Sequence, residues 1–212
     1  GHDRSKVVYI PNGVPGLEER QPTPLSRSKE VLFVGRIAHN KGLRELTRAV
    51  REITDPELRL SVVGDGELLA AIRRETRNDP RIRYLGWLGS SEVAERYRSC
   101  RFVVGPSLWH EVMNTVVCEA QSWSRPVIAT RVGGNEDLIV DGVSGILCPP
   151  GDVPTMQRAI ERLLNDDDLS AAIGRAGFEH VQQYGMRRHI DGIEELYKGL
   201  GHSAHAPVPR TS

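Results

Sequence analysis

The stretch Glu30-Val-Leu-Phe-Val-Gly-Arg-Ile-Ala-His-Asn-Lys-Gly42 decides the fold class of this chain. Its first half is a short β-branched run, which is typical of a buried strand. Its second half is a loop with two cations, and the apolar residues after it share one helix face: Leu43, Leu46, Val50 and Ile53. A strand that passes through a short loop into an amphipathic helix begins a parallel β–α–β unit.

The same alternation continues along the chain. Short apolar runs between turn residues predict strands at 6–10, 30–35, 58–63, 83–85, 101–104, 126–129 and 145–147. Helical spacing follows Gly42, Gly66 and Ser91, and it returns in three segments after residue 152, where no further strand pattern occurs. The sequence therefore predicts an α/β, doubly wound, Rossmann-like parallel sheet with its C-terminal helices packed outside.

The composition indicates a soluble globular protein. The 212 residues include 28 basic and 28 acidic side chains, which disfavours nucleic acid as a partner, and no apolar run is long enough to span a membrane. Three cysteines without a CxxC pair disfavour a disulfide framework or a zinc site and favour a cytoplasmic location. We expect residues 1–200 to form one domain and residues 201–212 to be a disordered tail.

The loop after the first central strand holds the first candidate site residues. Gly35, Arg36 and Lys41 would lie at the carboxyl edge of the sheet, where doubly wound folds bind their ligands. The first turn of the next helix adds free N–H groups, so a phosphate or diphosphate would fit there. A solvated basic loop is the alternative interpretation.

Two glycine-containing turns follow other strands. Gly64 and Gly66 do not make a dinucleotide fingerprint, because Leu69 stands where the third glycine would be. We interpret them as a tight turn that lets a backbone pass close to a ligand. Gly133-Gly134, before a short acidic helix start, is a second strand end suited to an anion.

Two carboxylates, Glu111 and Glu119, lie eight positions apart. If residues 112–124 form a helix, they are separated by ~12 Å along its axis. That is too far for a proton-sharing dyad, and it exceeds the ~5–9.5 Å of glycosidases. They could hold the two ends of one extended, hydroxyl-rich ligand. The alternative is that Glu111 complements the helix dipole and Glu119 faces solvent. The DxD sequence at 166–168 and the scattered histidines predict helix capping and no metal site.

Together these residues resemble the carboxyl-terminal nucleotide-binding domain of GT-B retaining glycosyltransferases of family 4, the "glycosyl transferases group 1". The likeness spans about residues 7–197. Seven motifs carry it in order: Pro11-Asn-Gly-Val14, Gly35-Arg36 with Lys41-Gly42, Val63-Gly-Asp-Gly66, Tyr84-Leu-Gly86, Pro106-Ser107 with Glu111 and Glu119-Ala120, Arg125-Pro-Val-Ile-Ala-Thr130, and Gly133-Gly134.

The resemblance implies a role for each matching residue. Arg36 and Lys41 would neutralise the diphosphate of a UDP- or GDP-linked sugar, Glu111 would bind the sugar hydroxyls, and Glu119 would bind the ribose. Glu111, Arg36 and Lys41 would thus be the catalytic residues, with no cofactor besides this substrate. Residues around Trp87 would meet the base, and the β-phosphate would meet the backbone of Val112, Met113, Asn114 and Thr115.

The family also sets the expected architecture. A GT-B enzyme places a second Rossmann-like domain before this one, usually with the acceptor site, so the chain is expected to be one half of such an enzyme. It would bind the donor but transfer no sugar alone, and any attachment to the membrane's inner face would reside in the other half. An envelope or exopolysaccharide product is expected by analogy.

Other interpretations remain open at this stage. The chain could be a non-catalytic nucleotide-sugar binding or regulatory module, or an enzyme like the nucleotide-sugar 2-epimerases. The residues decide neither the nucleotide, the sugar, the acceptor nor the oligomeric state. Three positions depart from the family: Met113-Asn114 replace commoner Gly or Pro, Arg125 replaces glycine, and either Glu136 or Asp137 takes the acidic position.

Overall fold

The computed structural model describes residues 7–203, with side chains to residue 200. These residues form a six-stranded sheet in the order β3-β2-β1-β4-β5-β6, and every neighbouring pair is parallel. The strands are β1 (Glu30–Val34), β2 (Arg59–Val63), β3 (Ile82–Gly86), β4 (Phe102–Gly105), β5 (Val127–Thr130) and β6 (Ile146–Cys148). This order confirms the doubly wound fold, and the direction of winding reverses between β1 and β4.

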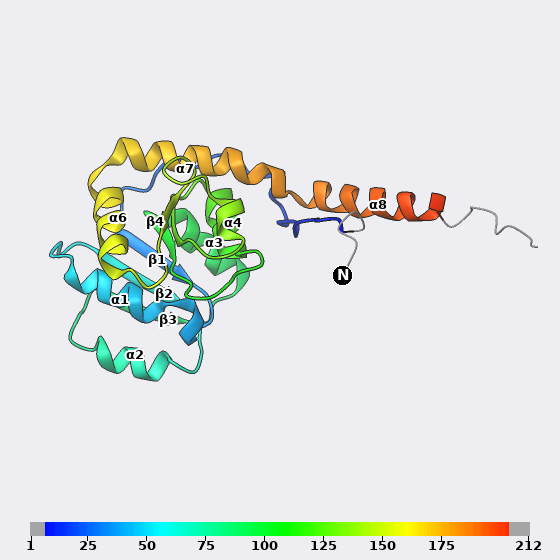
Figure 1. Cartoon of the computed structure of the whole chain (residues 1–212). Helices are drawn as coiled ribbons and strands as arrows, with labels where there is room; N and C mark the ends of the chain where they lie inside the picture. The colour runs from blue at the N-terminus through cyan, green and yellow to red at the C-terminus, as the bar shows by residue number, and fades with distance from the viewer. Residues whose placement is uncertain (1–6, 204–212) are drawn as a thin grey trace, which may run out of the picture.

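Helices cover both faces of the sheet (Figure 1). They are α1 (Leu43–Glu52), α2 (Leu69–Glu75), α3 (Ser90–Ser99), α4 (Thr115–Ser122), α5 (Asn135–Leu138), α6 (Val153–Asn165), α7 (Asp167–Val181) and α8 (Met186–Ser203), with 3-10 turns η2 (His39–Lys41) and η3 (Gln182–Tyr184). Residues of α1 and α6 share one core with one sheet face, and residues of α3 and α4 share a second core with the other.

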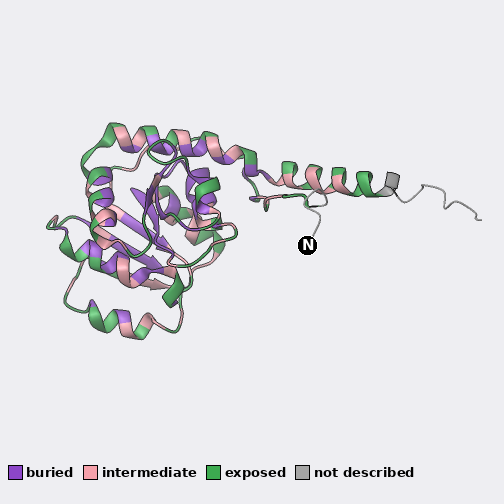
Figure 2. Cartoon of the chain, in the orientation of Figure 1, coloured by how far each residue is buried: buried purple, intermediate pink, exposed green. Residues whose placement is uncertain are grey.

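The sequence pattern explains the buried sheet. A parallel strand with helices on both sides is apolar along its whole length, and β4 and β5 are buried at every residue. Figure 2 shows this purple centre between helices that are green on their outer sides. Helix capping at the DxD stretch is also confirmed, because the Asp166 carboxylate accepts a hydrogen bond from the Leu169 N–H at 2.8 Å and begins α7.

The strand expected at 6–10 is wrong for the residues that the structure describes. Residues 7–10 join no sheet, and Val7, Val8 and Tyr9 are exposed; Lys6 lies outside the described residues. The segment runs beside the start of α8, where the Pro11 carbonyl lies 2.7 Å from His189 Nδ1 (Figure 1). A β-branched run becomes a strand only where a sheet edge accepts its backbone groups, and this run meets a helix.

The last helix also departs from expectation. α6 and α7 pack outside the sheet as predicted, but α8 extends away from the body of the molecule (Figure 1). It continues through Ser203, three residues into the expected tail, and residues 204–212 lie outside the described part. Within the described residues, we find no helix with the length and apolar character that crossing a membrane requires.

Candidate functional site

The candidate site lies where the winding of the sheet reverses. β1 and β4 pair side by side, with Leu32 opposite Val103, and their carboxyl ends open into adjacent loops. A pocket of about 210 Å³ lies between these loops. Its lining includes Gly35, Arg36, Lys41, Ser107, Glu111 and residues 113–116. Doubly wound sheets bind ligands at this point, as the sequence predicts.

Lys41 and Glu111 face each other in this pocket. Lys41 Nζ lies 2.6 Å from Glu111 Oε1, and the Ser107 hydroxyl donates a hydrogen bond of 2.6 Å to the same oxygen. Both charged side chains are partly withdrawn from solvent. The pair therefore brings together two of the three predicted catalytic residues, which are 70 positions apart in the sequence.

Glu111 does not stand directly before a helix, as the sequence suggested. The helix expected at 112–124 is α4, and it begins only at Thr115, so the ~12 Å axial separation from Glu119 does not apply. The reason is tertiary: the Gly134 N–H donates a hydrogen bond of 2.7 Å to the Glu111 carbonyl. This bond holds the segment before Thr115 as a loop against the turn that follows β5.

Three glycines allow these loops to meet. A Cβ on Gly42, which has φ +68°, would lie 1.9 Å from the Pro106 carbonyl oxygen. A Cβ on Gly133 or Gly134 would lie 2.5 Å or 2.3 Å from the carbonyl oxygens of Glu111 or Val112. The Gly133-Gly134 motif thus supports the backbone around Glu111.

Gly42→Ala is expected to destabilise the fold by about 3 kcal/mol, because it adds a left-handed backbone penalty to a clash with Pro106. Gly142→Ala is the matched control: Gly142 has φ +75° and open space around its Cβ, so about 1 kcal/mol is expected. Urea denaturation of both variants measures the difference. Equal losses of stability would show that the contact with Pro106 is unimportant.

A larger pocket of about 650 Å³ adjoins the first one. Val34, Gly35 and Arg36 line both pockets, so the two lie side by side around the end of β1. The larger pocket brings together three more predicted residues, Gly64, Trp87 and Glu119. Trp87 is 80% exposed at its rim, which leaves an indole face open to a flat ligand.

Glu119 is held by a buried tyrosine. The Tyr97 hydroxyl donates a hydrogen bond of 2.8 Å to Glu119 Oε2, and Tyr97 is 2% exposed. Burial, with the nearby Glu119 carboxylate, raises the pKa of Tyr97 well above its ordinary value, so the hydroxyl stays protonated and remains a donor. No described residue donates a hydrogen bond to Glu119 Oε1, which leaves that oxygen available to a ligand hydroxyl.

Arg20 and Trp123 also line the larger pocket, and no motif in the sequence marks Arg20 as a site residue. The Arg20 guanidinium lies 4.6 Å from the centroid of the Trp123 ring and donates a hydrogen bond to the Ser122 hydroxyl. Its burial lowers the pKa of Arg20. A lone arginine in the segment before β1 has no distinctive spacing, so only the folded structure shows its position.

Several predicted residues have a different setting from the one expected. The turn at Gly64 and Gly66 packs against the loop after β1, since Cβ atoms there would lie 1.9 Å and 2.4 Å from the carbonyl oxygens of Gly35 and Ile37. Close packing of two protein loops thus accounts for both glycines. Gly66 lines neither pocket, and Val112, which is 88% exposed, lines neither as well.

Comparison with known proteins identifies relatives of this arrangement. The family model described as "Glycosyl transferases group 1" matches residues 28–166. The chain is 32% identical to an uncharacterized glycosyltransferase, MJ1178, of Methanocaldococcus jannaschii, over 80% of this chain and 48% of that protein. It is also 32% identical to a D-inositol 3-phosphate glycosyltransferase of Corynebacterium jeikeium, over 84% of this chain and 45% of the relative.

Solved structures share the fold. A sucrose-phosphate synthase of Thermosynechococcus elongatus superposes with a TM-score of 0.81 at 26% identity, over 92% of this chain and 52% of that chain. Anabaena Alr3699/HepE in complex with UDP gives a TM-score of 0.75 at 22% identity, over 82% and 49%. The chain spans about half the length of these relatives.

Proposed function

Because the chain belongs to the glycosyl transferases group 1 family, we propose that it is the donor-binding half of a glycosyltransferase. The reaction would move a sugar, of hexosyl type, from a UDP- or GDP-linked donor to an acceptor hydroxyl. One observation carries the proposal: two neighbouring pockets share Arg36, and Lys41 and Glu111 line one of them while Glu119 lines the other. This arrangement suits an extended ligand with hydroxyls at both ends and negative charge between them.

The side chains suggest how the donor would lie. Glu119 would accept hydrogen bonds from ribose hydroxyls beside Trp87, and the diphosphate would lie near Arg36 and Lys41. The sugar would then reach Glu111, which already orients the Lys41 ammonium at 2.6 Å. The half-buried ion pair would hold that cation in place before the donor arrives, so little reorganisation would be needed.

The proposed chemistry transfers charge to the diphosphate. The bond between the anomeric carbon and the diphosphate oxygen breaks, and the acceptor oxygen bonds to the same face of the sugar with retention. A departing phosphate oxygen takes the acceptor proton. Arg36 and Lys41 would stabilise the leaving group and supply the positive charge that a metal ion supplies in other transferases, so the proposed transfer is metal-independent.

The whole protein's activity is part of the same proposal. The chain matches only about half the length of these relatives, and we propose that the acceptor is bound by a further domain of the GT-B type. The 212-residue chain would therefore bind donor without transferring sugar, in the cytoplasm, within a pathway of polysaccharide synthesis.

Calorimetric titration of the chain with UDP, GDP, ADP and NAD tests the proposal. We expect one nucleoside diphosphate to bind selectively, and both Arg36→Ala and Glu119→Ala to abolish that binding. Arg77→Ala is the control, because Arg77 is exposed after α2 and lines neither pocket. Binding that survives both site variants would refute the residue assignments, and preferential binding of NAD would refute the donor class.

A further inference from the structure

A separate polar pocket, of about 260 Å³, lies towards the amino-terminal ends of β1, β2 and β3. Arg36 and Glu119, at the site described above, lie by contrast near the carboxyl edge of the sheet. Among the residues that line this amino-end pocket are Glu30, Arg59, Ser61, Arg83 and Arg96. The proposed function uses none of them.

The strand register places four of these side chains on one sheet face. Glu30 of β1 is opposite Arg59 of β2, and Ser61 of β2 is opposite Arg83 of β3. Side chains that are directly opposite in a parallel pair point to the same face, and alternate residues of one strand do so too. This face is the one that α3 covers, and Arg96 reaches the pocket from α3.

Two polar groups in the amino-end pocket form no hydrogen bond with a described residue. Ser61 is 4% exposed, and its hydroxyl forms no hydrogen bond with residues 7–203. Glu30 Oε1 is buried without a hydrogen bond, and the nearest cation, Arg96 Nη1, is 3.9 Å away. Buried polar atoms are nearly always hydrogen-bonded, so Glu30 Oε1, left without a hydrogen bond in the pocket that also holds the free Ser61 hydroxyl, indicates an external partner.

The arginines remain available to the same partner. In the described structure Arg83 has neither an ion pair nor a hydrogen bond, and Arg59 uses Nη1 on the carbonyls of Pro56 and Leu58. Lys29, at the rim, is already neutralised by Asp55 at 2.9 Å and Glu57 at 2.7 Å. Three guanidinium groups against one carboxylate leave the pocket with an excess of positive charge.

We propose that the amino-end pocket binds a small phosphomonoester that carries hydroxyl groups. Guanidinium forks match phosphate oxygens, and the Ser61 hydroxyl adds a neutral donor. Glu30 Oε1 can only accept, so it selects a ligand with a hydroxyl beside its phosphate and disfavours a bare anion. Because Ser61 and Glu30 Oε1 are buried, a soluble molecule that enters the pocket fits better than a headgroup presented by a flat membrane.

Titration of the isotope-labelled chain with glycerol 1-phosphate and with inorganic phosphate, followed by amide chemical shifts, tests this proposal. We expect saturable shifts at Ser61 and Arg83, with glycerol 1-phosphate binding more tightly. Arg83→Gln should weaken both ligands about tenfold or more, since one charged hydrogen-bonding group is lost. Glu30→Gln should remove the preference for glycerol 1-phosphate, and Ser61→Ala should weaken both ligands.

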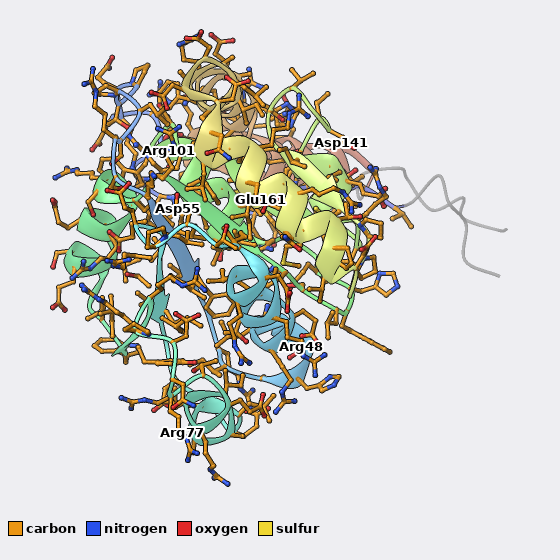
Figure 3. The ribbon with its side chains drawn as sticks, turned by 90° about the vertical axis from the view of Figure 1, so that its left-hand side faces the viewer. Arg48, Asp55, Arg77, Arg101, Asp141 and Glu161 are labelled. Carbon is orange, nitrogen blue, oxygen red and sulfur yellow. The ribbon has the colours of Figure 1, made fainter. Side chains whose placement is uncertain are left out.

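Arg77→Gln is the matched control, because Arg77 is an exposed arginine outside this pocket. Figure 3 shows it beyond α2, well separated from Asp55, the partner of Lys29 at the pocket rim. Arg83 is exposed and has no partner within residues 7–203, so its substitution should leave the fold intact.

Three outcomes would overturn the proposal. The first is the absence of saturable shifts, and the second is equal weakening by Arg77→Gln and Arg83→Gln. The third is sedimentation with phosphatidylglycerol vesicles that Arg83→Gln abolishes while glycerol 1-phosphate fails to bind, since this would assign the arginines to a membrane headgroup. None of these outcomes depends on the nucleotide titrations at Arg36 and Glu119. The proposal for the amino-end pocket is therefore tested independently of the proposal for donor binding.

Discussion

Lys41→Met is expected to lower donor affinity in this chain, and kcat/KM in the proposed two-domain enzyme, by about 100- to 1000-fold. The ammonium of Lys41 lies 2.6 Å from Glu111 Oε1, in the pocket where the diphosphate would bind. Methionine keeps much of the side chain's length and removes its charge. The leaving group then loses a cation, and the Glu111 carboxylate, half-buried and unpaired, repels the phosphates.

Lys29→Met is the control for this prediction. Lys29 also forms short ion pairs, with Asp55 and Glu57. It lies at the amino-terminal end of β1, whereas Lys41 lies in the loop beyond the strand's carboxyl end. Calorimetry and initial rates should show little change in this variant. The double variant Lys41→Met/Glu111→Gln should lose less donor affinity, in free energy, than the two single variants lose together, because the two residues act as a pair. Additive losses would contradict the pairing.

Arg125→Ala is expected to lower the free energy of unfolding by about 4 kcal/mol and Tm by about 8–16 °C. Arg125 is 1% exposed and lines neither pocket of the candidate site. Its guanidinium donates to four oxygen atoms, at 2.6–3.4 Å: the carbonyls of Trp123, Cys100 and Pro24 and the hydroxyl of Thr23. Alanine would leave a cavity and four acceptors without that donor.

Thermal and urea denaturation measure this loss. Arg48→Ala is the control, since Arg48 is exposed on α1 (Figure 3) and its change should stay within about 0.5 kcal/mol. Arg125→Met keeps the side-chain volume and removes the hydrogen-bond donors, so its loss of stability should lie between those of Arg125→Ala and Arg48→Ala. If Arg125→Ala were as stable as Arg48→Ala, the hydrogen bonds that tie Arg125 to the segment at 23–24 would contribute nothing to stability.

The strands could be predicted from sequence where local pattern and burial agree. β1 and β5 are short β-branched runs between turn residues, and each became a buried strand. Residues 7–10 have the same pattern, yet they lie beside α8. Local composition specifies that a segment can be extended, whereas strand pairing depends on which edge is within reach after the rest has folded.

The candidate site likewise combines features that follow from local sequence with contacts that form only in the folded chain. The placement of Arg36 and Lys41 at the carboxyl edge of the sheet could be predicted because strand, loop and helix are contiguous in the sequence. The Lys41–Glu111 contact and the Tyr97–Glu119 hydrogen bond join separate elements, so no local spacing encodes them. Arg125 is a further case. It departs from the family pattern, and its side chain points into the fold and donates hydrogen bonds to Thr23 and Pro24.

The position of β1 has a consequence for synthesis on the ribosome. β1 lies between β2 and β4 in the sheet. Lys41 follows β1 and Glu111 follows β4, so their separation of 70 residues approximates how much chain is made before β4 emerges to pair with β1. At about 5–20 residues per second, the nascent chain would carry one uncovered edge of β1 for about 4 to 14 s. An open apolar strand edge recruits other chains, so slow translation or truncation before β4 should favour aggregation or chaperone capture.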